Sequence, residues 1–226
     1  MSRLSLLAKT GLIRKKEAWC ITVWGWLLIL FCAAAATFGA LHAVFPFLAQ
    51  NDPVRCELLI VEGWIPDYHL PDVKAEFEEG RYKMLVLTGA AILKGQPFAE
   101  FKTFPELTRA ILVKQGWDET KVVAVPCGDA LRDRTYASAL ALKQWLADSQ
   151  RNVNQINIYS MGAHARRTRL LYEKAFDGKM NIGIIAGRER RFDGRSWWKT
   201  SEGVRTVLDE AIAYFYARFL FRPSNH

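Results

Sequence analysis

A histidine and two arginines stand together in the stretch Ser160-Met161-Gly162-Ala163-His164-Ala165-Arg166-Arg167. An apolar run precedes this stretch and a helical repeat of apolar residues follows it, which predicts a strand, a tight turn and a helix N-terminus. Such a turn presents free backbone N–H groups and the positive end of a helix dipole. We therefore expect an anion site to which Ser160, Gly162, Arg166 and Arg167 contribute. The alternative is a solvated arginine face with His164 as a helix cap.

Two residues are candidates for acid–base chemistry. His164 stands at a helix N-terminus beside two arginines, and both features disfavour its protonated form. We therefore expect a largely neutral imidazole at pH 7, which can act as a general base or donate to a ligand oxygen. Glu62, in the sequence Glu62-Gly63-Trp64 after an apolar run, is the second candidate.

A second polar group is the sequence Arg132-Asp133-Arg134-Thr135, which Asp129 precedes. Two arginines can clamp an anion through their planar forks, and Thr135 can cap a helix or donate its hydroxyl to a ligand. An Asp–Arg salt bridge within the sequence is the alternative. The two polar groups together predict an anion pocket.

The elements that position these residues alternate between strands and helices. Such alternation predicts a three-layer, Rossmann-like α/β domain with a mainly parallel sheet of about five strands. Ligands of such sheets bind beyond the carboxyl ends of the strands, where Thr88 and Gly89 also fall. We predict strands over Glu57–Val61, Met84–Leu87, Val122–Val125, Ile156–Tyr159 and Asn181–Ala186, and helices over Pro71–Glu79, Phe104–Gln115, 135–147 and Thr168–Phe176.

The last helix has the clearest periodicity. Ser201 is its predicted N-cap, and we expect its apolar face to pack on the sheet. That face comprises Val204, Val207, Leu208, Ala211, Ile212, Phe215 and Phe219. Aromatic residues at both ends allow two interpretations, core packing or contact with a bilayer surface; they are Trp197, Trp198, Phe219 and Phe221, with Arg222 beside them.

A long apolar segment precedes the α/β domain. No Asp, Glu, Lys or Arg occurs between Glu17 and Asp52, and the 24 residues Ala18–Leu41 are long enough to cross a bilayer as a helix. A cleaved signal peptide is the alternative, because Ala33–Ala36 offers small residues. We expect an uncleaved transmembrane helix over 18–41, a linker over 42–53 and the α/β domain over 54–226.

The charge distribution predicts the orientation of this helix. Residues 1–17 carry five basic and one acidic side chains, which leaves 26 basic and 22 acidic ones for the rest. The five basic ones, Arg3, Lys9, Arg14, Lys15 and Lys16, should keep the N-terminus in the cytoplasm. In a bacterium the protein would then be a single-pass inner-membrane protein with its α/β domain in the periplasm. The high pI partly reflects this topology, and we predict no nucleic-acid partner.

Several patterns limit the chemistry. Cys56 and Cys127 are expected as buried thiols, and no spacing resembles a zinc site. No Gly-x-Gly-x-x-Gly follows a predicted strand, which argues against a dinucleotide or adenosylmethionine binder, and the sequence leaves the identity of any cofactor unknown. The connection Ala90–Phe101, with Gly95 and Pro97, is a candidate lid or binding loop.

The order and spacing of these motifs resemble those of the SanA/ElyC/YdcF-like envelope proteins. The resemblance covers about Arg55–Ala186 and rests on Glu62-Gly63-Trp64, Thr88-Gly89, Arg134-Thr135-Tyr136-Ala137 and the stretch Ser160–Arg167. It implies a Rossmann-like fold behind a membrane anchor and a role in cell-envelope or surface-polysaccharide metabolism.

Two hypotheses of function follow. In the first, a hydrolase or transferase acts on a phosphorylated envelope or exopolysaccharide metabolite, such as a polyprenyl-linked sugar. His164 and Glu62 would be its catalytic residues, and the arginines would hold the phosphate. In the second, the same pocket binds an anionic precursor without converting it. In both, the bilayer and an anionic small-molecule or lipid-linked ligand are the partners.

Overall fold

The computed structural model describes residues 19–92 and 100–223. Within these ranges, the residues up to Ala40 and those from Leu41 onward form two separate compact units. The basic residues before Ala18 and the middle of the predicted lid, with Gly95 and Pro97, lie outside the described residues.

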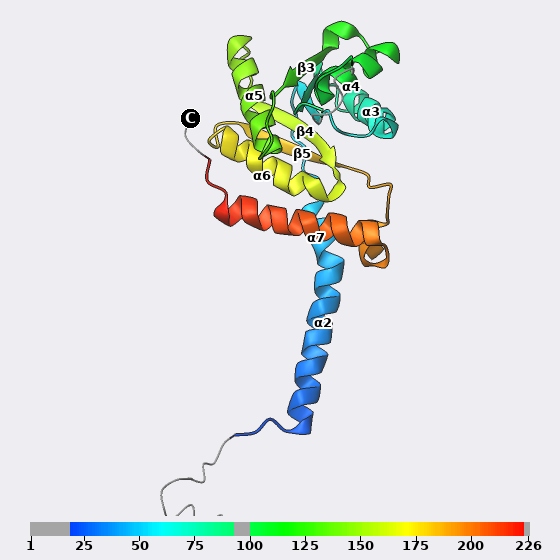
Figure 1. Cartoon of the computed structure of the whole chain (residues 1–226), viewed down its shortest axis with the longest axis vertical. Helices are drawn as coiled ribbons and strands as arrows, with labels where there is room; N and C mark the ends of the chain where they lie inside the picture. Colours follow the sequence, from blue (N-terminus) through cyan, green and yellow to red (C-terminus); the bar gives the residue numbers. More distant parts are fainter. Residues whose placement is uncertain (1–18, 93–99, 224–226) are drawn as a thin grey trace, which may run out of the picture. The chain divides into compact units, whose positions relative to one another are not determined.

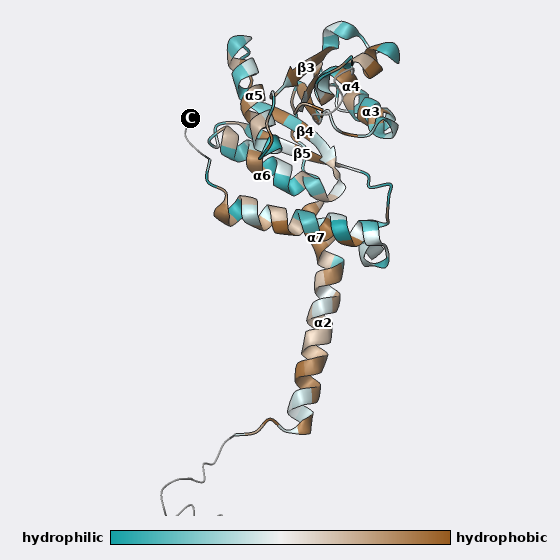
Figure 2. Ribbon diagram, in the orientation of Figure 1, coloured by the Kyte–Doolittle hydropathy of each residue, from teal (hydrophilic) through white to brown (hydrophobic). Residues whose placement is uncertain are grey.

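The helix α2 (Val23–Leu48) is long and apolar enough to cross a membrane. Figure 2 shows the hydrophobic colouring of this helix. The helix continues seven residues beyond the predicted end at Leu41, so most of the expected linker is helical. The physical reason is packing: Leu48 is buried in the α/β domain, and the ring of Phe45 lies 5.9 Å from that of Phe192.

The described strands form one five-stranded, all-parallel sheet, as the sequence predicts. They are β1 (Leu58–Glu62), β2 (Met84–Gly89), β3 (Val122–Pro126), β4 (Gln155–Met161) and β5 (Asn181–Gly187), in the order β3-β2-β1-β4-β5. Glu62 pairs with Thr88 in the β1/β2 register, so these two side chains share the carboxyl edge. The chain reverses its direction of winding between β1 and β4, which is where ligands bind in sheets of this order.

Helices cover both faces of the sheet and confirm the three-layer α/β architecture. On one face, α5 (Arg134–Asp148) and α6 (Ala165–Ala175) pack on side chains such as Ile60 and Ile158. On the other, α3 (Leu70–Glu79) and α4 (Phe104–Lys114) pack on side chains such as Leu59 and Leu87. Short 3₁₀ helices lie between these elements, at η1 (Asp67–His69), η2 (Glu119–Lys121), η3 (Gly162–His164) and η4 (Gly194–Lys199). The observed α6 begins three residues before the predicted Thr168.

The last helix, α7 (Ser201–Phe215), differs from the prediction in its packing. Both sheet faces are already covered, so α7 packs mainly on α6, η3 and η4, and Figure 1 shows it beside α6 on the side away from the strands. Its apolar residues therefore divide: Val207 is buried, whereas Ile212 and Phe219 are exposed. A π-helical turn, η5 (Tyr216–Leu220), follows.

Three smaller predictions have clear outcomes. Thr200 rather than Ser201 is the N-cap of α7, because its extended backbone lets its Oγ1 accept from the N–H of Gly203 at 3.1 Å. Trp197 and Phe221 are buried, as the core interpretation predicts. Cys56 and Cys127 are free thiols, although both are only half-buried.

Candidate functional site

A cavity of about 750 Å³ opens at the carboxyl edge of the sheet. Residues from β1, β2, α5, α6, α7 and η5 line it, so segments from the whole α/β domain contribute. The polar lining consists of Glu62, Thr88, Asp133, Arg134, Thr135, Ser138, His164, Arg167 and Glu210. The cavity thus brings together seven of the predicted site residues, Gly89 included.

Glu62 is the buried carboxylate of the cavity. It ends β1, it is 3% exposed, and the hydroxyl of Ser160 on β4 donates to its Oε2. The Ser160 hydroxyl also lies 3.3 Å from that of Thr168 on α6. Burial raises the pKa of Glu62, but the nearby charge of His164 and the hydrogen bond from Ser160 outweigh it, so the net shift of the pKa is downward. Glu62 is therefore ionised at neutral pH.

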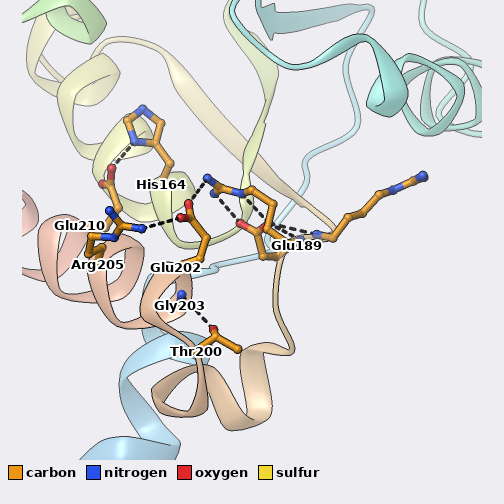
Figure 3. A network of polar contacts seen from close by, with 9 residues as sticks. His164, Glu189, Thr200, Glu202, Gly203, Arg205 and Glu210 are labelled. Atoms are coloured by element: carbon orange, nitrogen blue, oxygen red, sulfur yellow. Dashed lines mark hydrogen bonds and ion pairs between the residues drawn. The ribbon is translucent and has the colours of Figure 1, made fainter.

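The imidazole of His164 lies between two carboxylates. Its Nδ1 is 2.8 Å from Oε1 of Glu210, and its Nε2 is 3.3 Å from Oε1 of Glu62. Figure 3 shows His164 on the turn before α6 and Glu210 on α7 facing each other. The Nε2 contact is within ion-pair distance but is not aligned for a hydrogen bond. The indole of Trp64 meets the imidazole edge to face at 5.3 Å.

The protonation state of His164 is the opposite of the sequence-based prediction. Burial lowers its pKa, but the charges of Glu62 and Glu210 and the hydrogen bond with Glu210 raise the pKa to about 9. The imidazole is therefore cationic at pH 7. The prediction was wrong because it counted the nearby arginines and the helix dipole without the carboxylates, of which Glu210 stands 46 residues away in the sequence.

Arg167 completes this network by a two-pronged contact with Glu210. Its Nε donates to Oε2 at 2.8 Å and its NH2 donates to Oε1 at 3.0 Å. Burial raises the pKa of Glu210, but His164 and Arg167 lower it to about 2. The cations His164 and Arg167 thus balance the anions Glu62 and Glu210, so this part of the cavity has no net charge with which to hold an anion.

Hydrogen-bond chemistry fixes the proton on Nδ1 of His164. The NH2 group of Arg167 lies 2.9 Å from this nitrogen and is itself a donor. In the cationic imidazole Nδ1 carries a proton and donates to Glu210, so the approach of Arg167 is a contact between two donors that share Glu210 as acceptor. Both nitrogens of His164 therefore face carboxylates, which makes the ring a positioning group for Glu62 and Glu210.

The N-terminus of α5 forms a different wall of the cavity. Asp133, in the left-handed conformation with φ 49°, is the N-cap, but its side chain does not cap the helix. Arg134 is exposed to the cavity and forms no hydrogen bond or ion pair with any residue in the described ranges. Thr135 stands beside it. The first-turn N–H groups and the guanidinium are thus available to an anion.

Apolar side chains form the remaining wall. They come mainly from α6, α7 and η5, with contributions from the start of α4 and from the connections after β1 and before α5. The larger ones are Trp64, Phe104, Leu131, Leu171, Tyr216 and Phe221. A ligand that fills the cavity would therefore meet charged groups on one side and an apolar surface on the other.

Five of the predicted binding residues do not line the cavity. Asp129 and Arg132 are exposed on the connection before α5. Ser160 lies behind Glu62 and holds it in place. Gly162 borders a second hollow beside Glu189, and Arg166 stacks at 3.9 Å over the ring of Phe47. Arg166 does not line the cavity although Arg167 does, because consecutive residues of a helix point about 100° apart.

Glu210 is the functional candidate that the sequence analysis missed. No motif surrounds it, but it lies three residues after Val207 and four before Tyr214, on the inward side of α7. A charged residue in an otherwise apolar inward stripe needs a partner. This position in the stripe was the sequence signal that could have identified Glu210 as a candidate. Among residues 19–92 and 100–223, no group of three or more His, Cys, Asp or Glu is placed to hold a metal ion.

Comparisons with known proteins add no further assignment. A scan against protein-family models found no match to this chain. A search of curated proteins also found no significant match.

Proposed function

We propose that this protein is a membrane-anchored envelope protein that binds a phosphorylated cell-envelope or exopolysaccharide metabolite in the cavity. One observation carries the proposal: Arg134, without a partner in the described chain, lines the same cavity at the N-terminus of α5 and is separate from the charge-balanced network of Glu62, His164, Arg167 and Glu210. The phosphate would lie at Arg134, where the helix dipole and a guanidinium add their effects.

The other two walls specify what the phosphate is attached to. The carboxylates of Glu62 and Glu210 have lone pairs left after their contacts with Ser160, His164 and Arg167, and these can accept hydrogen bonds from sugar hydroxyls. The wall with Leu171 and Phe221 suits an apolar chain. The combined chemistry is that of a lipid-linked sugar phosphate. The resemblance to SanA/ElyC/YdcF-like proteins supports the same envelope context.

A binding experiment on the full chain in lipid nanodiscs tests this proposal. The probes are a short polyprenyl phosphate, the corresponding polyprenol and a sugar 1-phosphate. We expect saturable, salt-sensitive binding of the two phosphates, and a ligand at 100 times its Kd adds about 2.7 kcal/mol to the free energy of unfolding. Equal binding of polyprenol and polyprenyl phosphate would contradict it.

A second candidate function is a hydrolase or transferase that acts on the same class of ligand. The observation in its favour is a buried carboxylate with a shifted pKa, held by Ser160 and His164 at the floor of a cavity. Cationic His164 would then donate a proton to the leaving group, and ionised Glu62 would hold the imidazolium in place. In an enzyme, His164→Gln should lower turnover by roughly 10²–10⁴ and change affinity only a few-fold. In a binding protein, the same change should act on affinity alone.

We also propose that the α/β domain lies in the periplasm of a bacterial cell, with α2 in the inner membrane. The basic residues before α2 support this orientation. A reporter fused after His226 in a bacterial host tests it. Alkaline phosphatase activity is expected, whereas fluorescence from a reporter that matures only in the cytoplasm would reverse the assignment.

A further inference from the structure

One side of α7 exposes a continuous row of large apolar residues. Leu208, Ile212, Phe215 and Phe219 follow one another at intervals of four, three and four, and so share one side of the helix. The π-helical turn extends this side with Leu220. Ile212 is 69% exposed and Phe219 is 68% exposed. We call these five residues the outer face of α7.

An adjacent side of α7 holds the end of α2. Val207 and Tyr214 belong to the same apolar cluster as Phe45 and Leu48 in the last turns of α2. The backbone carbonyl of Leu41 accepts a hydrogen bond from the indole of Trp197, just before α7, at 2.8 Å. The end of the apolar helix is therefore fixed to α7 within one compact unit.

The length of α2 places this junction at a membrane surface. A hydrocarbon layer about 30 Å thick takes about 20 helical residues. Of the 26 residues in α2, the eight from Leu41 to Leu48 belong to the compact unit of the α/β domain, which leaves the 18 residues Val23–Ala40. At 1.5 Å per residue these span roughly 27 Å. Leu41 is thus near the point where the helix leaves the hydrocarbon.

The flanks of the outer face also suit a lipid surface. Arg205, Arg218 and Arg222 are exposed around it, with Asp209 as an exposed acidic residue on α7. Arginine side chains beside an apolar stripe can extend to lipid headgroups while their stems cover apolar surface. Aromatic rings such as those of Phe215 and Phe219 are typical of the boundary between hydrocarbon and headgroups.

We propose that the outer face of α7 lies in the interfacial layer of the bilayer that α2 crosses. An amphipathic helix in this position buries its apolar side about 5–10 Å into the headgroup region. Because Glu210, Ala213 and Ala217 on other sides of the same helical segment line the cavity, the cavity then stands directly above the lipid surface. The lipid contact does not depend on the proposed ligand, but it gives a lipid-linked ligand a short path to the site.

Depth-dependent fluorescence quenching tests the position of α7. The full chain, with its four cysteines replaced by alanine, is labelled with an environment-sensitive fluorophore at Ile212→Cys, Phe215→Cys or Phe219→Cys and reconstituted in liposomes. Leu140→Cys is the matched control, because Leu140 is also an exposed apolar helical residue, at 42%, but lies on α5. Spin-labelled lipids with the label near the headgroup or deep in the acyl chain are the quenchers.

We expect blue-shifted emission and strong quenching by the shallow lipid label at all three α7 positions, with weaker quenching by the deep label and none at Leu140. Emission and aqueous-quencher access equal to those at Leu140 would refute the contact. Blue-shifted emission without lipid quenching would indicate that protein covers this face. If energy transfer between labels on different copies also grows with the protein-to-lipid ratio, a second copy covers the face, and the proposed lipid contact is refuted.

Discussion

Nδ1 of His164 lies 2.8 Å from Oε1 of Glu210, and this contact joins the turn after β4 to α7 across 46 residues of sequence. Each partner changes the ionisation of the other. The same contact closes one side of the cavity, because Glu210 reaches it only through the packing of α7 on α6. The polar network is therefore a product of tertiary structure.

The stability of the fold should depend on the charge of His164. The pKa of His164 is about 9 in the folded protein and ordinarily 6.5. The contribution of its charge to the free energy of unfolding is therefore fully present below pH 6.5 and is lost as the pH rises through 9. The melting temperature of the full chain in detergent should fall over this range, and His164→Gln should flatten the fall. Identical slopes for the two proteins would show that His164 does not titrate as described.

The charge of His164 should in turn depend on Glu62. Removing one of its two carboxylate partners by Glu62→Gln should move the pKa of His164 down from about 9, as measured by NMR titration of the ring carbons. Glu189→Gln is the matched control, since Glu189 is a similarly buried carboxylate that pairs with Arg191 instead. An unchanged titration of His164 in the Glu62→Gln variant would show that Glu62 does not set its charge.

Arg167 should matter more for stability than its neighbour Arg169. Their side chains are 20% and 22% exposed, but the partner of Arg167, Glu210, is only 16% exposed, whereas the partners of Arg169, Asp52 and Glu173, are 60% and 43% exposed. Arg167→Met should cost about 3 kcal/mol and Arg169→Met under about 1 kcal/mol.

The double variant Arg167→Met/Glu210→Leu separates this pair from other effects of the substitutions. It removes the unpaired carboxylate and leaves His164 with Glu62, so part of the loss should return. Chemical unfolding of the full chain in detergent measures these differences. Additive losses in the double variant would mean that the two side chains do not interact.

The sequence predicted the parts of the structure that depend on local patterns. Short apolar runs located all five strands, and strand–helix alternation determined the parallel sheet and its ligand edge. Glu62 ends β1 and His164 lies just after β4. The rule that ligands bind beyond the carboxyl ends of parallel strands therefore predicted correctly that these two residues lie together. Interactions between distant elements escaped prediction: Glu210 has no motif, and the helical direction that separates Arg166 from Arg167 depends on where α6 begins.

The last helix shows why periodicity alone was insufficient. A stripe of apolar residues predicts that a helix has an apolar side, but it does not say what covers that side. Because α5 and α6 already cover the sheet face next to α7, only residues such as Val207 reach the core, and Ile212 and Phe219 remain exposed. Which residues of that stripe are buried can be predicted only when the positions of the other helices are known.

The most direct test of the proposed ligand is the affinity of two arginine variants for polyprenyl phosphate. Arg134 lines the cavity, whereas Arg132, two residues before it and equally basic, is exposed outside it. A charge-assisted contact of about 1.5–3 kcal/mol predicts that Arg134→Ala weakens binding at least about tenfold, without loss of melting temperature, and that Arg132→Ala leaves it near the wild-type value. Equal affinities of the Arg134→Ala variant and the wild type would contradict the account.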